Sequence, residues 1–222
     1  MHGDPRLRRQ IPVSRPPTNR LARLAHLVLC LLCILAWAPA AGAAGSGPTE
    51  QLRGAIDRVL HVLQDPALKV EARLPDRRRA VRQIADEIFD FDETARRAMA
   101  QHWRSLTAAQ QKEFVALFSD LLERAYMSKI ELYGGEKIQY AGERVEGDFA
   151  TVSTRIITKN GTEVPTDYRM LKRGDRWWIY DVSIEGVSLV ANYRTQFNSI
   201  IRTSSYDELL RKMRSRAEEI PH

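Results

Sequence analysis

Residues 177–197, WWIYDVSIEGVSLVANYRTQF, join a strand to a helix and decide the fold of this chain. The segment up to Ile184 is rich in aromatic and β-branched side chains, which is typical of a strand. Glu185-Gly186 then ends the strand, because glycine relieves the backbone where the chain turns. A helix is expected to begin near Ser188. The segment holds no nucleophile beside a base, no ring of metal ligands and no phosphate-binding glycine loop, so it indicates a scaffold.

Before this segment, from Glu136 onward, the side chains alternate with a period of two, which predicts an antiparallel meander of four strands. The strands are expected at about 137–144, 149–159, 164–173 and 176–184. The register of the second strand is open. A two-residue Asn160-Gly161 loop would place Ile157 opposite Val164, whereas a one-residue bulge would turn three other side chains inward. These are Val152, Thr154 and Ile156.

Helical spacing dominates the rest of the chain. A helix capped by Thr49 is expected to run to Asp65-Pro66, and a second helix follows Pro75-Asp76. Asp92 is the expected cap of a third helix and Thr107 that of the longest one. Two further helices are expected at 188–202 and 206–216. This order predicts a single α+β domain at 44–222, with helices in 49–133, the sheet in 136–185 and helices in 188–216 on one face of a strongly curved sheet.

Residues 1–43 have the pattern of a secretory signal peptide. Arginines precede an apolar run at 27–38 that is too short to span a bilayer, and alanine pairs at 38–40 and 41–43 offer cleavage sites. Cleavage after Ala43 is favoured over cleavage after Ala40, and an uncleaved anchor is the alternative. Both cysteines, Cys30 and Cys33, lie in this leader, so their spacing indicates neither a redox motif nor a zinc half-site.

Charge and histidine content exclude several classes of function. The chain carries a net charge of +6, but residues 44–222 hold 28 basic and 27 acidic residues, a net charge of +1. A nearly neutral domain argues against nucleic-acid binding. The histidines of this part, His61, His102 and His222, are too widely separated for a metal site, and no cofactor is expected.

Several motifs together resemble the MlaC family, also called the toluene-tolerance or Ttg family, of periplasmic lipid carriers. Besides 177–197 they are Phe91-Asp92, Trp103 with Leu106-Thr107, the helix carrying Phe114 to Tyr126, Asn160-Gly161 and Tyr168-Arg169. The resemblance covers roughly 49–213. Met99 to His102 depart from it, because they stand where the family pattern has a Leu-Gly pair.

The resemblance implies a curved sheet of the NTF2-like or cystatin-like kind, with a deep apolar cleft between sheet and helices. It also implies a monomeric carrier, not an enzyme, that shuttles phospholipid between an outer-membrane lipoprotein complex and an inner-membrane ABC transporter with its lipid-binding subunit. Such transport maintains the lipid asymmetry of a Gram-negative envelope. Two long acyl tails need a deep cleft, because their burial is worth about 0.8 kcal/mol per methylene, on the order of 20 kcal/mol in total.

The candidate lipid-contacting residues come from the third and fourth strands and the longest helix. Strict alternation places Trp177 and Ile179 on one face of the fourth strand, and Tyr180, Val182 and Ile184 with Trp178 on the other. Val164 and Val187 are the strongest candidates. The full set is Val164, Tyr168, Met170, Tyr180, Val182, Ile184, Val187, Phe114, Phe118, Leu121 and Tyr126. Arg169, Lys172 or Arg194 are expected near the headgroup.

Three alternatives stay open at this point. The ligand could be another envelope lipid such as a hopanoid, since the apolar side chains do not discriminate between the two. A small enzyme of the cone-shaped α+β type could use Asp181 as a general acid or base, although no partner base accompanies it. An adaptor subunit with a filled core is the third.

Overall fold

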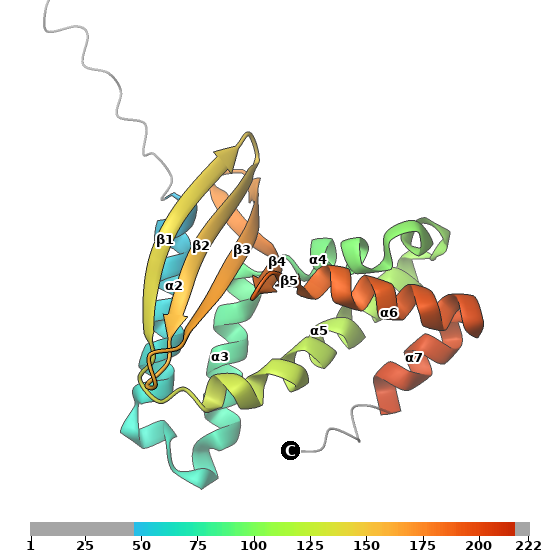
Figure 1. Cartoon of the computed structure of the whole chain (residues 1–222). Coiled ribbons are helices and arrows are strands. Elements are labelled where there is room, and N and C mark those ends of the chain that lie inside the picture. The colour runs from blue at the N-terminus through green and yellow to red at the C-terminus, as the bar shows by residue number, and fades with distance from the viewer. Residues whose placement is uncertain (1–46, 216–222) are drawn as a thin grey trace, which may run out of the picture. The chain divides into compact units, whose positions relative to one another are not determined.

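The computed structural model describes residues 47–215. The expected leader at 1–43, with its cleavage sites, lies outside the described residues, so the division into leader and domain stays a prediction. Within 47–215 no helix combines the length and the apolar character needed to cross a bilayer. The described part of the chain has an α+β fold, with helices before and after one curved antiparallel sheet (Figure 1).

The sheet has its strands in the order of the sequence. They are β1 (Lys137–Glu146), β2 (Phe149–Ile157), β3 (Glu163–Arg173), β4 (Arg176–Ile184) and β5 (Val187–Ser188). The predicted meander is confirmed, and the short strand β5 extends it. Glu185 and Gly186 turn the chain between β4 and β5 with φ of 50° and 80°. Two successive positive φ values are typical of the tight turn that suits a two-residue hairpin loop.

The loop between β2 and β3 settles the register that the sequence left open. Thr158 and Thr162 close a three-residue loop, in which the amide of Thr158 donates to the carbonyl of Thr162 at 2.9 Å and Gly161 has a φ of 80°. The extra residue shifts the pairing by one position, so Ile156 lies opposite Val164. The inward side chains of β2 are therefore those of the second alternative: Val152, Thr154 and Ile156.

Strand β4 contains a bulge that the sequence analysis did not foresee. The pairing of β3 with β4 shifts between Arg169 and Met170, which leaves Tyr180 as an extra residue on β4. Strict alternation was therefore the wrong expectation beyond this point, because a bulge reverses which face later residues occupy. Tyr180 lies on the outer face of the sheet. The inner face of β4 is formed by Trp177, Ile179, Val182 and Ile184.

The predicted helices are all present. They are α2 (Pro48–Gln64), α3 (Leu74–Ile88), α4 (Phe91–Met99), α5 (Ala108–Glu131), α6 (Leu189–Thr203) and α7 (Tyr206–Ser215). Thr107 caps α5 through a capping box with Gln110, and Ser188 caps α6. The start of α4 differs from the prediction. Asp90, not Asp92, caps this helix, because its carboxylate accepts a hydrogen bond from the Glu93 amide at 2.9 Å.

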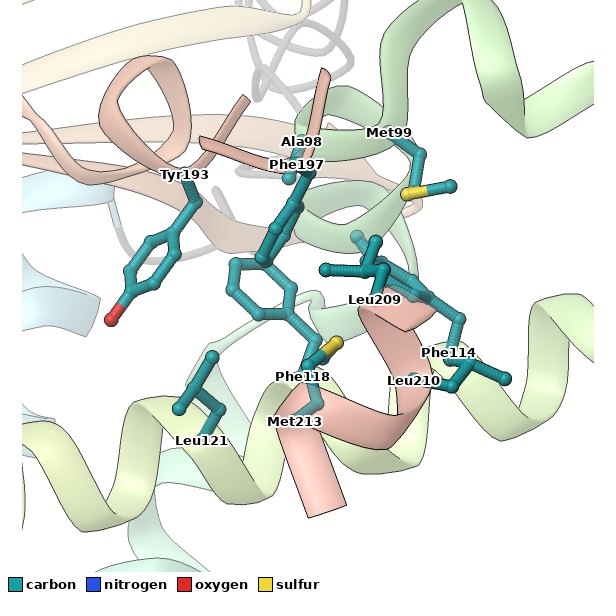
Figure 2. Packing of buried hydrophobic residues seen from close by; sticks show 11 residues of the cluster. Ala98, Met99, Phe114, Phe118, Leu121, Tyr193, Phe197, Leu209, Leu210 and Met213 are labelled. Carbon is teal, nitrogen blue, oxygen red and sulfur yellow. The ribbon is translucent and has the colours of Figure 1, made fainter. Parts of the chain in front are cut away.

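The interior is divided into two main cores. The sheet core packs α2 and the end of α3 against the inner sheet face, and consists of Leu52, Ile88, Ala150, Val152, Met170, Trp177, Ile179 and Val182. The helical core is formed by α4, α5, α6 and α7 (Figure 2). Its centre is aromatic: the ring of Phe118 meets Phe197 edge-on at 5.2 Å and Tyr193 at 5.1 Å. A small third cluster joins α2, α3 and α5 through Leu63, Val81 and Met127.

Asp181 connects the two main cores by tying the start of α6 to β4. Its Oδ1 accepts from the Val190 amide at 3.0 Å, and its Oδ2 accepts from the Ser188 hydroxyl at 2.6 Å and from Arg169 at 3.2 Å. The Ser188 hydroxyl in turn accepts from the Ala191 amide at 3.0 Å. The carboxyl group of this buried residue is thus fully engaged in holding the strand and the helix together.

Replacing Asp181 with Asn should lower the free energy of unfolding by about 2 kcal/mol. The amide of Asn has one acceptor oxygen, so it cannot accept hydrogen bonds on both sides as the carboxylate does, and the charge-assisted bonds are lost. Urea unfolding followed by circular dichroism measures this. Asp175→Asn, in an exposed turn, is the control and should change stability by less than about 0.5 kcal/mol. Equal unfolding midpoints for the Asp181 variant and the parent protein would show that the hydrogen bonds of Asp181 contribute nothing to stability.

Candidate functional site

The inner face of the sheet is buried along most of its length, including Thr166, which pairs with Ile184 at the end of β4. Met170 and Ile179 are fully buried, and Val182 is nearly so, since they pack in the sheet core. Val164, Tyr168 and Ile184 face the same side but are only half-buried. Apolar surface on the inside of the sheet is therefore left partly uncovered towards the end of β4.

Some of the predicted contact residues of α5 are likewise enclosed in a core, and others are accessible to a ligand. Phe114 and Phe118 are 0% and 2% exposed and lie inside the helical core, so their side chains contact only protein in this conformation. Leu121 lines a groove of about 480 Å³ between α5, α6 and α7. Tyr126, further along the helix, is half-buried. Only the last two of these side chains are available to a ligand without rearrangement of the core.

The groove has a mostly apolar lining. Besides Leu121 it is lined by Tyr193, Phe197, Ile200, Leu209 and Met213, with Gln196 and Lys212 among the polar residues. A second groove of about 490 Å³ lies between α2 and α3; its lining is also mostly apolar, and Asp57, Arg58 and Glu87 are its charged residues. Pockets of about 300–1,000 Å³ hold drug-sized ligands. The first groove by itself is therefore too small for a ligand with two long apolar chains.

Five residues are called the junction here: Tyr168, Ile184 and Leu189, which pack against the sheet core, and Tyr126 and Tyr193, which lie near each other on α5 and α6. Leu189 packs against the sheet core, and Tyr193, one turn further along α6, belongs to the helical core. All members except Tyr193 are half-buried. In Figure 2 the Tyr193 ring lies at the edge of the helical core, and its hydroxyl points away from the other labelled side chains. The four half-buried members therefore present aromatic and aliphatic surface that the two cores cover only in part.

The electrostatics of the junction favour neutral groups. Burial raises the pKa of the Tyr168 hydroxyl to about 12, with Tyr140 adding to the shift, although a hydrogen bond with Thr154 opposes it. Burial raises the pKa of Tyr126 to about 12 as well, and nearby Tyr193 adds to it. Both phenols remain protonated near neutral pH. The junction as defined contains no charged side chain and suits an apolar ligand with uncharged polar groups.

Tyr180 and Val187, two of the predicted contact residues, lie in neither of the two cores nor at the junction. Tyr180 is on the outer face because of the bulge, where its ring meets Phe149 at 6.3 Å and carries the Arg97 guanidinium at 4.0 Å. The expectation that Tyr180 shares a face with Val182 and Ile184 is therefore wrong. Val187 is at the tip of the β4–β5 hairpin and is 59% exposed, so it lies at the surface beside Ile184, its pairing partner.

The basic residues expected near a headgroup have structural partners. Arg169 pairs with Asp181, Arg194 donates to the carbonyl of Arg97 at 3.0 Å, and the Lys172 ammonium lies 5.9 Å from the Trp177 ring. Asp181 is equally committed, which leaves the enzyme alternative without a free carboxylate at the junction. Among residues 47–215 no group of three or more His, Cys, Asp or Glu side chains is placed to hold a metal ion.

Leu189 and Tyr193 were not among the predicted contact residues. A signal for them was present, because Leu189, Tyr193, Phe197 and Ile200 recur at the spacing of one helical face. The sequence analysis had no reason to prefer this face over the aromatic face of α5, since the side of the sheet on which α6 lies depends on the turn at Glu185 and Gly186.

Known proteins resemble this chain in sequence and in fold. The family model described as MlaC protein matches residues 53–215. The intermembrane phospholipid transport system binding protein MlaC of Haemophilus influenzae is 24% identical over 179 residues, which are 78% of this chain and 84% of that protein. The toluene tolerance protein ttg2D of Pseudomonas putida is 22% identical over 130 residues, 58% of this chain and 60% of that protein.

A solved structure has the same fold. The phospholipid-binding protein from Ralstonia solanacearum, determined in complex with a phospholipid, superposes with a TM-score of 0.70 at 27% sequence identity. The match covers 77% of this chain and 97% of that protein. The family model spans nearly all of the described helices and the whole sheet. On this evidence the chain belongs to the MlaC protein family.

Proposed function

We propose that this chain is a periplasmic phospholipid-binding protein that holds the acyl tails of its lipid at the junction. The observation that carries the proposal is the partly uncovered apolar surface between two otherwise complete cores. A relative of the same fold, at 27% identity, was solved with a phospholipid bound. Acyl tails need such surface, because each methylene that leaves the bilayer must regain about 0.8 kcal/mol in another dry environment.

Binding of two tails requires the helices to move apart. The groove of about 480 Å³ is too small for both chains, so binding of both would require it to widen. The main backbone contacts of α5 are with α4 and α7 rather than with the sheet. Movement of α5 away from the sheet would open the space between Tyr126 and Ile184, but it would have to break the ion pairs of α5 with Arg78 and Arg82 of α3.

The wider role that we propose is transport between membranes. The similar protein from Haemophilus influenzae is named as the binding protein of an intermembrane phospholipid transport system. By this likeness the chain would receive lipid from an outer-membrane lipoprotein complex and exchange it with an inner-membrane ABC transporter through its lipid-binding subunit, and so maintain envelope asymmetry. The carrier itself would catalyse no reaction and act as a monomer, and residues 1–43 would direct its export.

Lipid extracted from the purified protein should contain phospholipid, because release from the junction during purification would expose the acyl tails to water. Mass spectrometry of the organic extract identifies the lipid class. A triterpenoid in place of phospholipid would favour the hopanoid variant of the proposal. Protein that carries no lipid of either kind, although folded by circular dichroism, would contradict a carrier role.

Replacing Val164 with Glu should abolish the co-purification of lipid while the protein stays folded. Val164 is half-buried on the inner sheet face, where a carboxylate among acyl tails would be poorly solvated. The same change at Val187, on the exposed hairpin tip, should reduce lipid loading.

Val145→Glu is a matched control, since Val145 is a strand residue that is 48% exposed. Lipid content is read by mass spectrometry and folding by circular dichroism. Unchanged loading in both the Val164 and the Val187 variants, alongside the control, would remove these residues from the binding site.

A further inference from the structure

The tyrosines of this chain differ in how their hydroxyl groups are satisfied. The hydroxyl of Tyr133 donates to the carbonyl of Glu136 and that of Tyr206 to the carbonyl of Gln110, each at 3.1 Å. These two have a clear structural use. Within residues 47–215 the hydroxyl of Tyr126 makes no such hydrogen bond, and Tyr126 lies near Tyr193 of α6 and the ammonium of Lys129.

A tyrosine hydroxyl in this position is energetically unfavourable unless a neighbouring group accepts a hydrogen bond from it. Tyr126 lies two turns beyond Phe118 on the face of α5 that continues from the helical core. Phenylalanine would fill the same volume without a polar atom. Because Tyr126 is half-buried, water can reach its hydroxyl in the empty protein. Acyl tails that enter the junction would displace this water, and a buried hydroxyl left without an acceptor is unfavourable.

A ligand that fits must therefore bring an acceptor oxygen to the depth of Tyr126. The pKa of this phenol is raised to about 12 by burial, so it is a neutral donor and cannot attract a cation. The ammonium of Lys129 lies 5.4 Å from the centre of the Tyr126 ring and is exposed. The solvent side of the tyrosine is thus positively charged, and the inner side is apolar.

The charged, hydrogen-bonding and apolar parts of a phospholipid follow one another in an order that matches these surroundings of Tyr126. Its phosphate is anionic, its acyl chains are apolar, and ester carbonyls lie between them. With tails at the junction and the phosphate beside Lys129, the ester carbonyls come to the depth of the Tyr126 hydroxyl. A hydrocarbon skeleton such as a triterpenoid lacks an acceptor at the start of its apolar part.

We propose that the Tyr126 hydroxyl donates a hydrogen bond to an ester carbonyl of the bound lipid and so selects acyl esters over ether-linked lipids of the same shape. This inference rests on the proposed phospholipid binding and adds a specificity determinant to it. Tyr193 of α6, a member of the helical core, lies near Tyr126 and contributes to its raised pKa.

The test compares two lipids that differ only in the carbonyls. Phosphatidylglycerol with two ester-linked hexadecanoyl chains competes at equal concentration with its analogue carrying two ether-linked hexadecyl chains. Native mass spectrometry of the purified protein gives the ratio of the two complexes. The parent protein should favour the ester lipid by about fivefold, the ratio expected for one neutral hydrogen bond.

Tyr126→Phe should bring this ratio close to one by weakening binding of the ester lipid alone. Tyr206→Phe is the control. It loses the same hydroxyl from a half-buried tyrosine outside the junction, so it should keep the preference of the parent protein. Circular dichroism confirms that both variants are folded.

An ester preference that survives in Tyr126→Phe, or equal binding of the two lipids by the parent protein, would overturn the inference and leave the proposed function standing. Absence of binding by either lipid to the folded parent protein would refute the proposed function, and the inference with it.

Discussion

The hydrogen bonds of Asp181 are the interaction on which the arrangement of this molecule depends. The bulge in β4 turns Tyr180 and Asp181 to the outer side of the strand, and the next residues, Val182 and Ile184, to the inner side. The carboxylate then fixes the first turn of α6 through Ser188 and Val190. One irregularity therefore provides both an apolar wall and the anchor of the helix beside it, without placing a charge on the inner face.

Two complete cores on either side make a partly uncovered junction tolerable. The aromatic packing of Phe118, Tyr193 and Phe197 holds α5 and α6 together. The sheet core holds α2 against β2, β3 and β4 independently of that packing. Because each core has its own packing contacts, a change in their separation would leave both sets of contacts in place and would break the ion pairs of Arg78 and Arg82 with α5. The proposed carrier role needs such a change in separation, since the protein would have to accept and release a large apolar ligand.

Much of the fold could be predicted from the sequence because its signals are local. Thr107 and Ser188 are residues of the type that caps helices, so they indicate where α5 and α6 begin. The alternation of side chains with a period of two is clear along β3. The features that escaped prediction depend on pairing between distant residues. Nothing near Tyr180 marks a bulge, which exists only relative to the register of β3. The same limit applies to the site: Val164 and Ile184 follow from alternation once the faces are known, whereas the exposure of Val187 and the enclosure of Phe118 depend on how completely the helices cover the sheet.

The central claim is that acyl tails occupy the space between the inner sheet face and helices α5 and α6. A crystal structure of this protein loaded with a phospholipid tests it most directly. The account predicts continuous density for the tails against Tyr168, Ile184 and Leu189, with α5 displaced from the sheet. Tails bound in the groove between α2 and α3, or a junction filled by the protein's own side chains in the loaded state, would contradict it.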